Sequence, residues 1–263
     1  MIRSLYTAAS GMSAQQMNLD SIANNLANSS TTGFRQSRLQ FQDMVYQNLI
    51  TPGAGQSDST VSAGLQIGLG TKSAATEVIM TQGELKQTSN QYDLAIEGNG
   101  FFQIQRPDGT TAYTRAGQFH MNSQGTLVTT DGDALLPNIT VPANATSVTI
   151  TQYGVVNATL AGQTNPSQLG TIQLATFPNP GGLSQMGGNL MAATLSSGDP
   201  VVGNPGGTEG LGTLQQGYLE NSNVDVVTEF VQMVLAQRAY ESDSKVVKTA
   251  DDMYSDTNSM SHA

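Results

Sequence analysis

The residues that could do chemistry in this sequence do not form a complete ligand-binding motif. Gly68-Leu69-Gly70-Thr71-Lys72-Ser73 approaches a phosphate-binding loop, but Thr71 stands where a glycine should precede the lysine. Asp131 and Asp133 have the spacing of calcium ligands, yet no carboxylate ladder or distal glutamate follows them. We interpret both aspartates as turn residues, and we predict neither a nucleotide site nor a calcium site.

The sequence also offers few residues for acid–base catalysis or for metal binding. Glu77, Glu84 and Glu97 are the only candidates for a hydrolytic pair of carboxylates, and no Ser-His-Asp or Cys-His set can be assembled. The chain has no cysteine, and neither His120 nor His262 has a second histidine at ligand spacing. The sequence therefore predicts no catalytic residue, no metal and no cofactor.

Composition narrows the class of partner. Only 11% of the residues are charged and the net charge is −10, so the chain is too acidic to follow a phosphate backbone and we expect no nucleic acid partner. No apolar run approaches the roughly 18 residues of a membrane span, so we expect no membrane insertion. The N-terminal stretch also lacks the apolar core of a cleavable secretory signal.

Two segments with helical periodicity, one near each end, must organise the fold. The first apolar series is Ile2, Leu5, Ala9, Met12, Gln16, Leu19, Ala23 and Leu26, and the second is Val226, Phe230, Met233, Gln237, Tyr240, Ser244, Val247, Asp251 and Tyr254. Their alternating spacing of three and four predicts coiled-coil seams. We expect the first helix to end at Asn28 and a capping box at 222–225 to precede the second. The second helix has another apolar face that includes Val227, Val231 and Val234, which favours a bundle between chains. The alternative is a single helical hairpin within one chain.

The middle of the chain reads as β structure. Residues 34–50 suit a short helix or an extended segment, and short apolar strands separated by turns follow from Tyr92 onward. The sequence therefore predicts an α+β fold: long N- and C-terminal helices forming a coiled-coil-type bundle, with an inserted, mainly antiparallel β domain.

Both terminal segments resemble a known family. The motifs are Gly11-Met12, Ala14-Gln15-Gln16, Leu19-Asp20, the run from Ile22 to Asn28, Thr32-Gly33-Phe34, Ser222-Asn223-Val224-Asp225 and Gln237-Arg238-Ala239-Tyr240-Glu241. Together they resemble the terminal signatures of bacterial flagellar rod and hook proteins. An isolated coiled coil would not reproduce their polar positions. Arg35 replaces the more usual lysine, which we expect to change little.

The resemblance implies three parts. Residues 1–30 and 222–263 would form a terminal helical domain lining an inner tube, 31–91 and 205–221 an extended intermediate segment, and 92–204 an outer β domain. The implied assembly interface comprises Ile2, Leu5, Met12, Leu19, Ile22, Leu26, Phe230, Met233, Tyr240 and Val247.

The resemblance also implies a structural role and not an enzymatic one. The chain would polymerise helically with itself into a rigid hollow shaft that transmits motor torque to the hook. Its implied partners are proximal rod and hook proteins, the envelope rings and the flagellar type III export apparatus. Its implied location is the periplasm-spanning rod of the basal body, reached without signal cleavage. Phe41 and Val45 resemble the export element of such subunits, although a buried phenylalanine on a helix is the simpler reading.

The segment 51–69 distinguishes members of the family. Within 46–70, Tyr46-Gln47, Pro52-Gly53-Ala54 and the run from Gly64 to Gly68 resemble the insertion of members that build the distal rod, which hook subunits lack. The residues assigned to this rod-specific segment are Pro52, Leu65, Ile67 and Leu69. A proximal rod or hook protein is the near alternative. A carbohydrate-binding β module with helical arms, and an enzyme that cuts peptidoglycan, are the alternatives from other classes.

Overall fold

The structure, a computed structural model, describes residues 2–50, 64–163, 165–207 and 210–261. The chain divides into two compact units. Residues 1–27, 37–77 and 225–263 form one, here called the helical unit, and residues 28–36 and 78–224 form the other, the β unit. Segments from both ends of the chain therefore meet in the helical unit, and the β unit is inserted between them in sequence.

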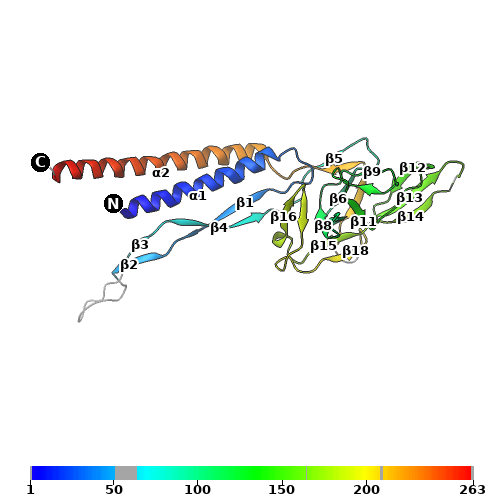
Figure 1. Cartoon of the computed structure of the whole chain (residues 1–263), viewed down its shortest axis with the longest axis horizontal. Helices are drawn as coiled ribbons and strands as arrows, with labels where there is room; N and C mark the ends of the chain where they lie inside the picture. The colour runs from blue at the N-terminus through cyan, green and yellow to red at the C-terminus, as the bar shows by residue number, and fades with distance from the viewer. Residues whose placement is uncertain (1, 51–63, 164, 208–209, 262–263) are drawn as a thin grey trace. The chain divides into compact units, whose positions relative to one another are not determined.

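Two α-helices, α1 (Ile2–Ala27) and α2 (Val226–Ser261), lie side by side and run in opposite directions (Figure 1). Helix α2 begins after Asp225, whose carboxylate accepts hydrogen bonds from the Val227 backbone at 3.0 Å and the Thr228 hydroxyl at 2.9 Å. The hydrogen bond from the Thr228 hydroxyl, followed by those from the Val227 and Thr228 backbone, lowers the pKa of Asp225. The cap therefore stays ionised where the helix dipole favours a negative charge.

The predicted coiled-coil bundle is wrong. Among the described residues there are only these two α-helices, one near each end, and most other elements are strands. The buried residues in the described part of α1 are Ala8, Ala14, Ile22 and Asn25, none of which belongs to the predicted seam. Small or polar side chains at Ala8, Ala14 and Asn25, together with Gly11, allow α1 and α2 to approach closely, and the seam residues Leu5, Met12, Leu19 and Leu26 are only half-buried. The helical hairpin within one chain, which we had left as the alternative, is what forms.

An extended two-stranded arm completes the helical unit. Strand β1 (Ser37–Asp43) pairs with β4 (Thr71–Val78), and β2 (Tyr46–Ile50) pairs antiparallel with β3 (Leu65–Gly68). Figure 1 shows the second pair continuing from the first. The segment 34–50 is thus extended and not helical, because its alternating side chains suit a strand pair.

The β unit is built from short strands whose described pairings are all antiparallel. Its largest sheet has nine strands in the order β16-β17-β8-β7-β11-β10-β9, with β15 pairing both β7 and β18. Those strands are β7 (Phe101–Gln105), β8 (Thr111–Thr114), β9 (His120–Met121), β10 (Leu127–Val128), β11 (Ala134–Leu136), β15 (Leu174–Thr176), β16 (Ser184–Gly187), β17 (Leu190–Ala192) and β18 (Val201–Gly203).

Smaller sheets surround this one. A three-stranded sheet has the order β12-β13-β14, and β6 pairs with β19 while β5 pairs with β20. Their bounds are β5 (Leu85–Gln87), β6 (Leu94–Glu97), β12 (Ala145–Ile150), β13 (Val155–Leu160), β14 (Ser167–Thr171), β19 (Thr213–Gln216) and β20 (Tyr218–Glu220); a short 3-10 helix, η1, spans Pro180–Gly182. The sheets thus bring residues from about 85 to 220 into one unit.

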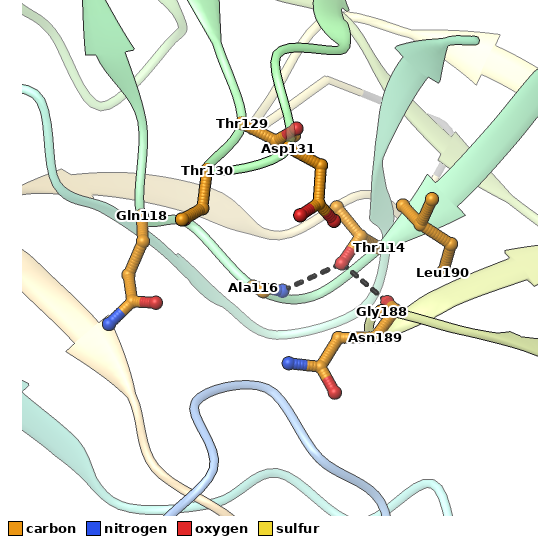
Figure 2. Close-up of a pocket in the computed structure, with 9 residues that line it drawn as sticks. All are labelled: Thr114, Ala116, Gln118, Thr129, Thr130, Asp131, Gly188, Asn189 and Leu190. Atoms are coloured by element: carbon orange, nitrogen blue, oxygen red, sulfur yellow. Dashed lines mark hydrogen bonds between the residues drawn. The ribbon is translucent and has the colours of Figure 1, made fainter.

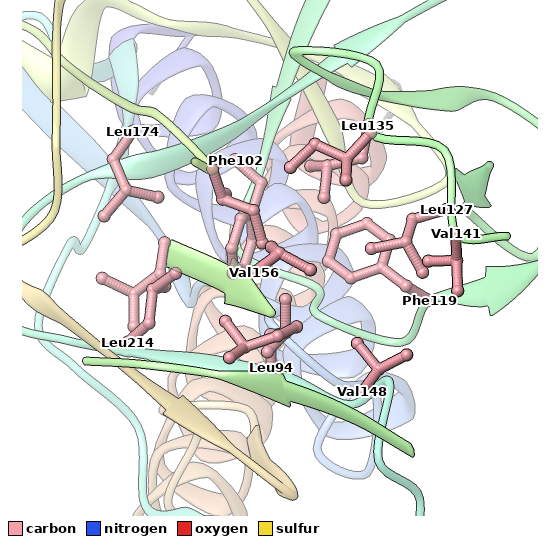
Figure 3. Packing of buried hydrophobic residues seen from close by; sticks show 14 of the residues in the cluster. Leu94, Phe102, Phe119, Leu127, Leu135, Val141, Val148, Val156, Leu174 and Leu214 are labelled. Atoms are coloured by element: carbon pink, nitrogen blue, oxygen red, sulfur yellow. The ribbon is translucent and has the colours of Figure 1, made fainter. Parts of the chain in front are cut away.

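One large apolar core holds the β unit together (Figure 3). Phe102 and Phe119 are fully buried at its centre, with ring centroids 5.2 Å apart in an edge-to-face arrangement. A smaller cluster forms around Phe101, Tyr113 and Phe177. Because burying one large apolar side chain contributes about 1.5–3 kcal/mol, these cores give the β unit its own source of stability.

Candidate assembly surface

The outward face of α2 is apolar. Val227, Phe230, Val231, Val234 and Leu235, here called the α2 stripe, are between 50% and 72% exposed. Their spacing of i, i+3, i+4, i+7 and i+8 places them on one side of the helix, the pattern of a face that normally packs against another element. An apolar face of this kind is the usual signature of a surface that another protein covers.

The opposite face of α2 is its buried face, and it contains Glu229, Ala236 and Ala250. Glu229 is buried there, and its Oε2 accepts a hydrogen bond from Asn25 Nδ2 at 3.3 Å. Farther along the pair, Gly11 lies so close to Asp243 that a β-carbon would approach its Oδ2 to 2.7 Å. The two faces of α2 thus differ: one is a close contact of small and polar side chains inside the chain, and the other is an exposed apolar surface.

The residues of the predicted interface differ in their exposure to solvent. Ile22 is buried, while Leu5, Met12, Leu19, Leu26, Met233 and Val247 are half-buried beside the helix contact and Phe230 and Tyr240 are exposed. Ile2 begins α1, and its side chain lies outside the described part. The sequence placed Val227, Val231 and Val234 on a second apolar face but not in the predicted interface, and it missed Leu235, although the helical period of these residues was the signal for the stripe.

The arm carries a second exposed apolar surface. All five residues of β2 are exposed, and Leu65 and Ile67 of β3 are 51% and 39% exposed. Leu69, just after β3, is exposed as well, whereas Pro52 falls in 51–63, outside the described residues. A two-stranded ribbon with uncovered apolar side chains is marginal by itself in water.

The predicted export element also lies on this arm. Phe41 is exposed on β1 and Val45 is exposed between β1 and β2. The simpler reading of a buried phenylalanine on a helix is therefore wrong. The accessibility of both residues leaves the export role as a proposal.

Asn25 ties the arm to the helix pair. Its Nδ2 donates to the Ser37 carbonyl at 2.8 Å, and its Oδ1 accepts from the Ser37 backbone N–H at 3.0 Å. Because the same amide also reaches Glu229 of α2, one buried side chain connects three elements. A buried amide in this position is the kind of fully satisfied polar group that fixes a single arrangement.

Glu77, one of the candidate acids, does not resemble a catalytic acid. Hydrogen bonds from Arg38 and then Gln40 lower the pKa of Glu77, the opposite of the raised pKa that a general acid needs. Residues 68–73 join β3 to β4, so the near-phosphate-loop motif lacks the helix that such a loop requires. Among the described residues there is no cluster of three potential metal ligands.

A pocket of about 190 Å³ in the β unit has a mixed polar and apolar lining (Figure 2). Thr114 donates its hydroxyl to the Asn189 carbonyl at 2.7 Å and accepts from the Ala116 backbone at 3.0 Å. Gln118 and Asp131 also line the pocket. Its described lining residues include no aromatic side chain on which a sugar ring could stack.

A buried charge cluster in the β unit was not anticipated. Glu220, fully buried, accepts hydrogen bonds from Arg35 Nη2 at 2.6 Å and from Arg115 Nη1 at 3.3 Å. Burial lowers the pKa of Arg115 to about 10, while the Glu220 charge opposes this shift and the Arg35 charge adds to it. Arg35, which we expected to matter little, is instead one of the most buried side chains of the unit.

No helix in the described part of the chain combines the length and apolar character needed to cross a membrane.

Comparison with known proteins covers nearly the whole chain. Family models described as "Flagella basal body rod protein", "Flagellar hook protein FlgE/F/G D1 domain" and "Flagellar basal body rod FlgEFG protein C-terminal" match residues 5–35, 95–158 and 215–260. The chain is 46% identical to the flagellar basal-body rod protein FlgG of Borreliella burgdorferi, over 99% of both chains. It is 42% identical to FlgG of Bacillus subtilis, over 96% of this chain and 97% of the relative. With the rod protein FlgF of Mesorhizobium japonicum it shares 31% identity over 93% and 92% of the chains.

Proposed function

We infer the function of this chain from the family to which it belongs, the flagellar basal-body rod proteins. It is a structural subunit of the rod, and its location is the flagellar basal body. The resemblance carried by the terminal motifs is thereby confirmed. Membership of this family implies that the subunit polymerises with itself and associates with other basal-body components.

One observation supports self-assembly most strongly. Among the described residues of the helical unit, Ile22 is the only buried apolar side chain larger than alanine. The same unit exposes the α2 stripe and the apolar side chains of β2 and β3. A unit that buries so little apolar surface alone gains stability when copies of the chain cover these faces.

Finer assignments are proposals that follow from the resemblance. We assign the subunit to the distal rod, since its identity to the two FlgG proteins exceeds its identity to the FlgF protein. The proposed partners are proximal rod and hook proteins, the rings of the envelope and the flagellar export apparatus, with Phe41 and Val45 in the export element. In this proposal the helices face the inside of a tube, residues 92–204 face outward, and the subunit performs no catalysis.

Val231→Asp tests the assembly surface. It places a charge in the centre of the α2 stripe, where assembly would bury it without a partner, so we expect tubes to be lost while the β unit remains folded. Electron microscopy and sedimentation of the purified full chain, under conditions in which the unmodified chain assembles, measure the effect. Leu19→Asp, from the predicted seam, should act in the same direction.

The control introduces the same charge on the β unit. Leu195 is fully exposed there, so Leu195→Asp should assemble as the unmodified chain does. Normal tubes from Val231→Asp would rule out the α2 stripe as a subunit interface.

A second prediction concerns the arm and residues 51–69, including Pro52. Deleting residues 51–69 removes β3, the partner of β2, together with Leu65, Ile67 and Leu69. We propose that these aliphatic side chains pack against a neighbouring subunit, where each contributes about 1.5–3 kcal/mol if fully covered. Tubes lacking the segment should then bend more easily because neighbours slide past one another.

The measurement is the persistence length of assembled tubes imaged by electron microscopy. Leu65→Asn with Ile67→Asn keeps the chain length and removes only the apolar contact, so it should soften the tube in the same direction. Equal stiffness in all three proteins would assign the rigidity to other contacts.

A further inference from the structure

A pocket of the β unit holds a buried excess of positive charge. Its volume is about 140 Å³, and its lining includes Arg35, Arg115, Met80, Phe101 and Thr176. Arg35 and Arg115 are 1% and 5% exposed, and both pair with the single carboxylate of Glu220. Two guanidinium charges and one carboxylate leave a net charge of +1 in the interior.

The hydrogen bonds of the two guanidinium groups are incomplete. Arg35 uses Nη2 for Glu220, but its Nε and Nη1 have no hydrogen-bond partner among the described residues. Arg115 uses Nη1 for Glu220 and Nη2 for the Gly98 carbonyl at 2.7 Å, and its Nε likewise has none within the described chain. Buried charged donors are costly unless they are paired, so unpaired ones require an explanation.

The carboxylate of Glu220 already accepts three hydrogen bonds, and its single negative charge cannot balance two guanidinium charges. Its Oε1 accepts from Arg35 and from the Gly83 backbone N–H at 3.0 Å, and its Oε2 accepts from Arg115. The Arg115 guanidinium also lies 5.3 Å from the centre of the Phe101 ring, which supplies only a weak negative potential. A second negative group is therefore needed to balance the pair of arginines.

We propose that this pocket binds a small oxyanion, of the size of acetate or inorganic phosphate, against Arg35 and Arg115. Planar guanidinium groups match the oxygens of a carboxylate or phosphate, and one negative charge would neutralise the cluster. The apolar walls formed by Met80 and Phe101 limit the size of the ligand and strengthen its attraction by excluding water. The oxyanion comes either from solution or from an acidic side chain of a neighbouring copy.

Thermal unfolding of the unassembled full chain tests the site. Acetate and phosphate are compared at matched ionic strength with a bulky organic sulfonate that the pocket cannot admit. At about 100 times its Kd, a small oxyanion should raise the Tm by roughly 5–10 °C, and the sulfonate should leave it unchanged. An equal response to all three anions would show a general salt effect and overturn the proposal.

Two variants locate the effect. Arg35→Met removes the arginine with two unpaired nitrogens and should abolish the response to acetate and phosphate, whereas Arg106→Met removes a surface arginine paired with Asp108 and should preserve it. A response that persists in Arg35→Met would place the anion elsewhere. If Arg35→Met does not fold, the comparison of anion sizes in the unmodified chain decides alone.

Assembled tubes distinguish the two sources of the oxyanion. If a neighbouring copy supplies its carboxylate, acetate should stabilise the unassembled chain and have no effect on the tube. If the ligand is a free anion, both forms should respond. An absence of response in the unassembled chain would mean that the pocket does not bind an oxyanion.

Discussion

Glu220→Gln should destabilise the β unit by about 3–5 kcal/mol, because it leaves Arg35 and Arg115 buried without a negative partner. A loss of this size is a large part of the 5–15 kcal/mol typical of a folded protein and should lower the Tm by roughly 10 °C. The chain contains no tryptophan, so denaturant unfolding of the full chain is best followed by near-ultraviolet circular dichroism of its tyrosines.

The control removes a glutamate from an exposed ion pair. Glu77 contacts Arg38 at 2.9 Å, and the two side chains are 44% and 63% exposed. Water already screens this pair, so Glu77→Gln should change stability far less than Glu220→Gln. Equal losses of stability in Glu77→Gln and Glu220→Gln would show that burial does not strengthen the effect of losing the carboxylate.

Gly117→Ala should cost about 3 kcal/mol or more, near or above the upper limit usual for overpacking. A β-carbon at Gly117 would fall on the backbone carbonyl of Leu94, whose own N–H donates to the Gly117 carbonyl at 3.0 Å. The clash involves backbone atoms at the start of β6, so no side-chain rotation can relieve it. Hydrogen exchange of the β6 amides and the unfolding midpoint measure the loss.

Gly181→Ala is the matched control in the same unit. At Gly181 the nearest atom to an added β-carbon is Asn179 Oδ1, at an ordinary contact distance of 3.5 Å. The change in stability should therefore stay within about 1 kcal/mol. A similar large loss at both glycines would attribute the effect to glycine replacement in general.

Local features were predictable because short-range chemistry determines them. Helix α1 ends before Asn28, where turn residues follow in the sequence. Helix α2 starts directly after the predicted capping segment, but its cap is Asp225 and not Ser222. The turn at Asn122–Gly125 follows from its sequence, and the Gly125 N–H donates to the Asn122 carbonyl at 3.0 Å. Each of these features depends on a few consecutive residues.

The pairing of the helices was not predictable from periodicity. A spacing of three and four marks an apolar face but does not say which neighbour covers it. In this chain Gly11 lies against Asp243 and Asn25 bonds Glu229 of α2, whereas the apolar residues of the α2 stripe stay exposed. The charge cluster was even harder to predict from the sequence, because Arg35 and Glu220 are 185 residues apart.

The contact between Asn25 and Glu229 has a consequence for the order in which the protein matures. These residues are separated by 204 positions, with the β unit inserted between them. If the chain leaves a ribosome or a narrow channel with its N-terminal end first, the hydrogen bond between Asn25 and Glu229 cannot form until nearly the whole chain has emerged. The β unit, whose core lies between residues 94 and 214, can meet all of its apolar partners earlier. Folding is therefore sequential: the contact between α1 and α2 can form only after the β unit and most of α2's preceding chain have emerged.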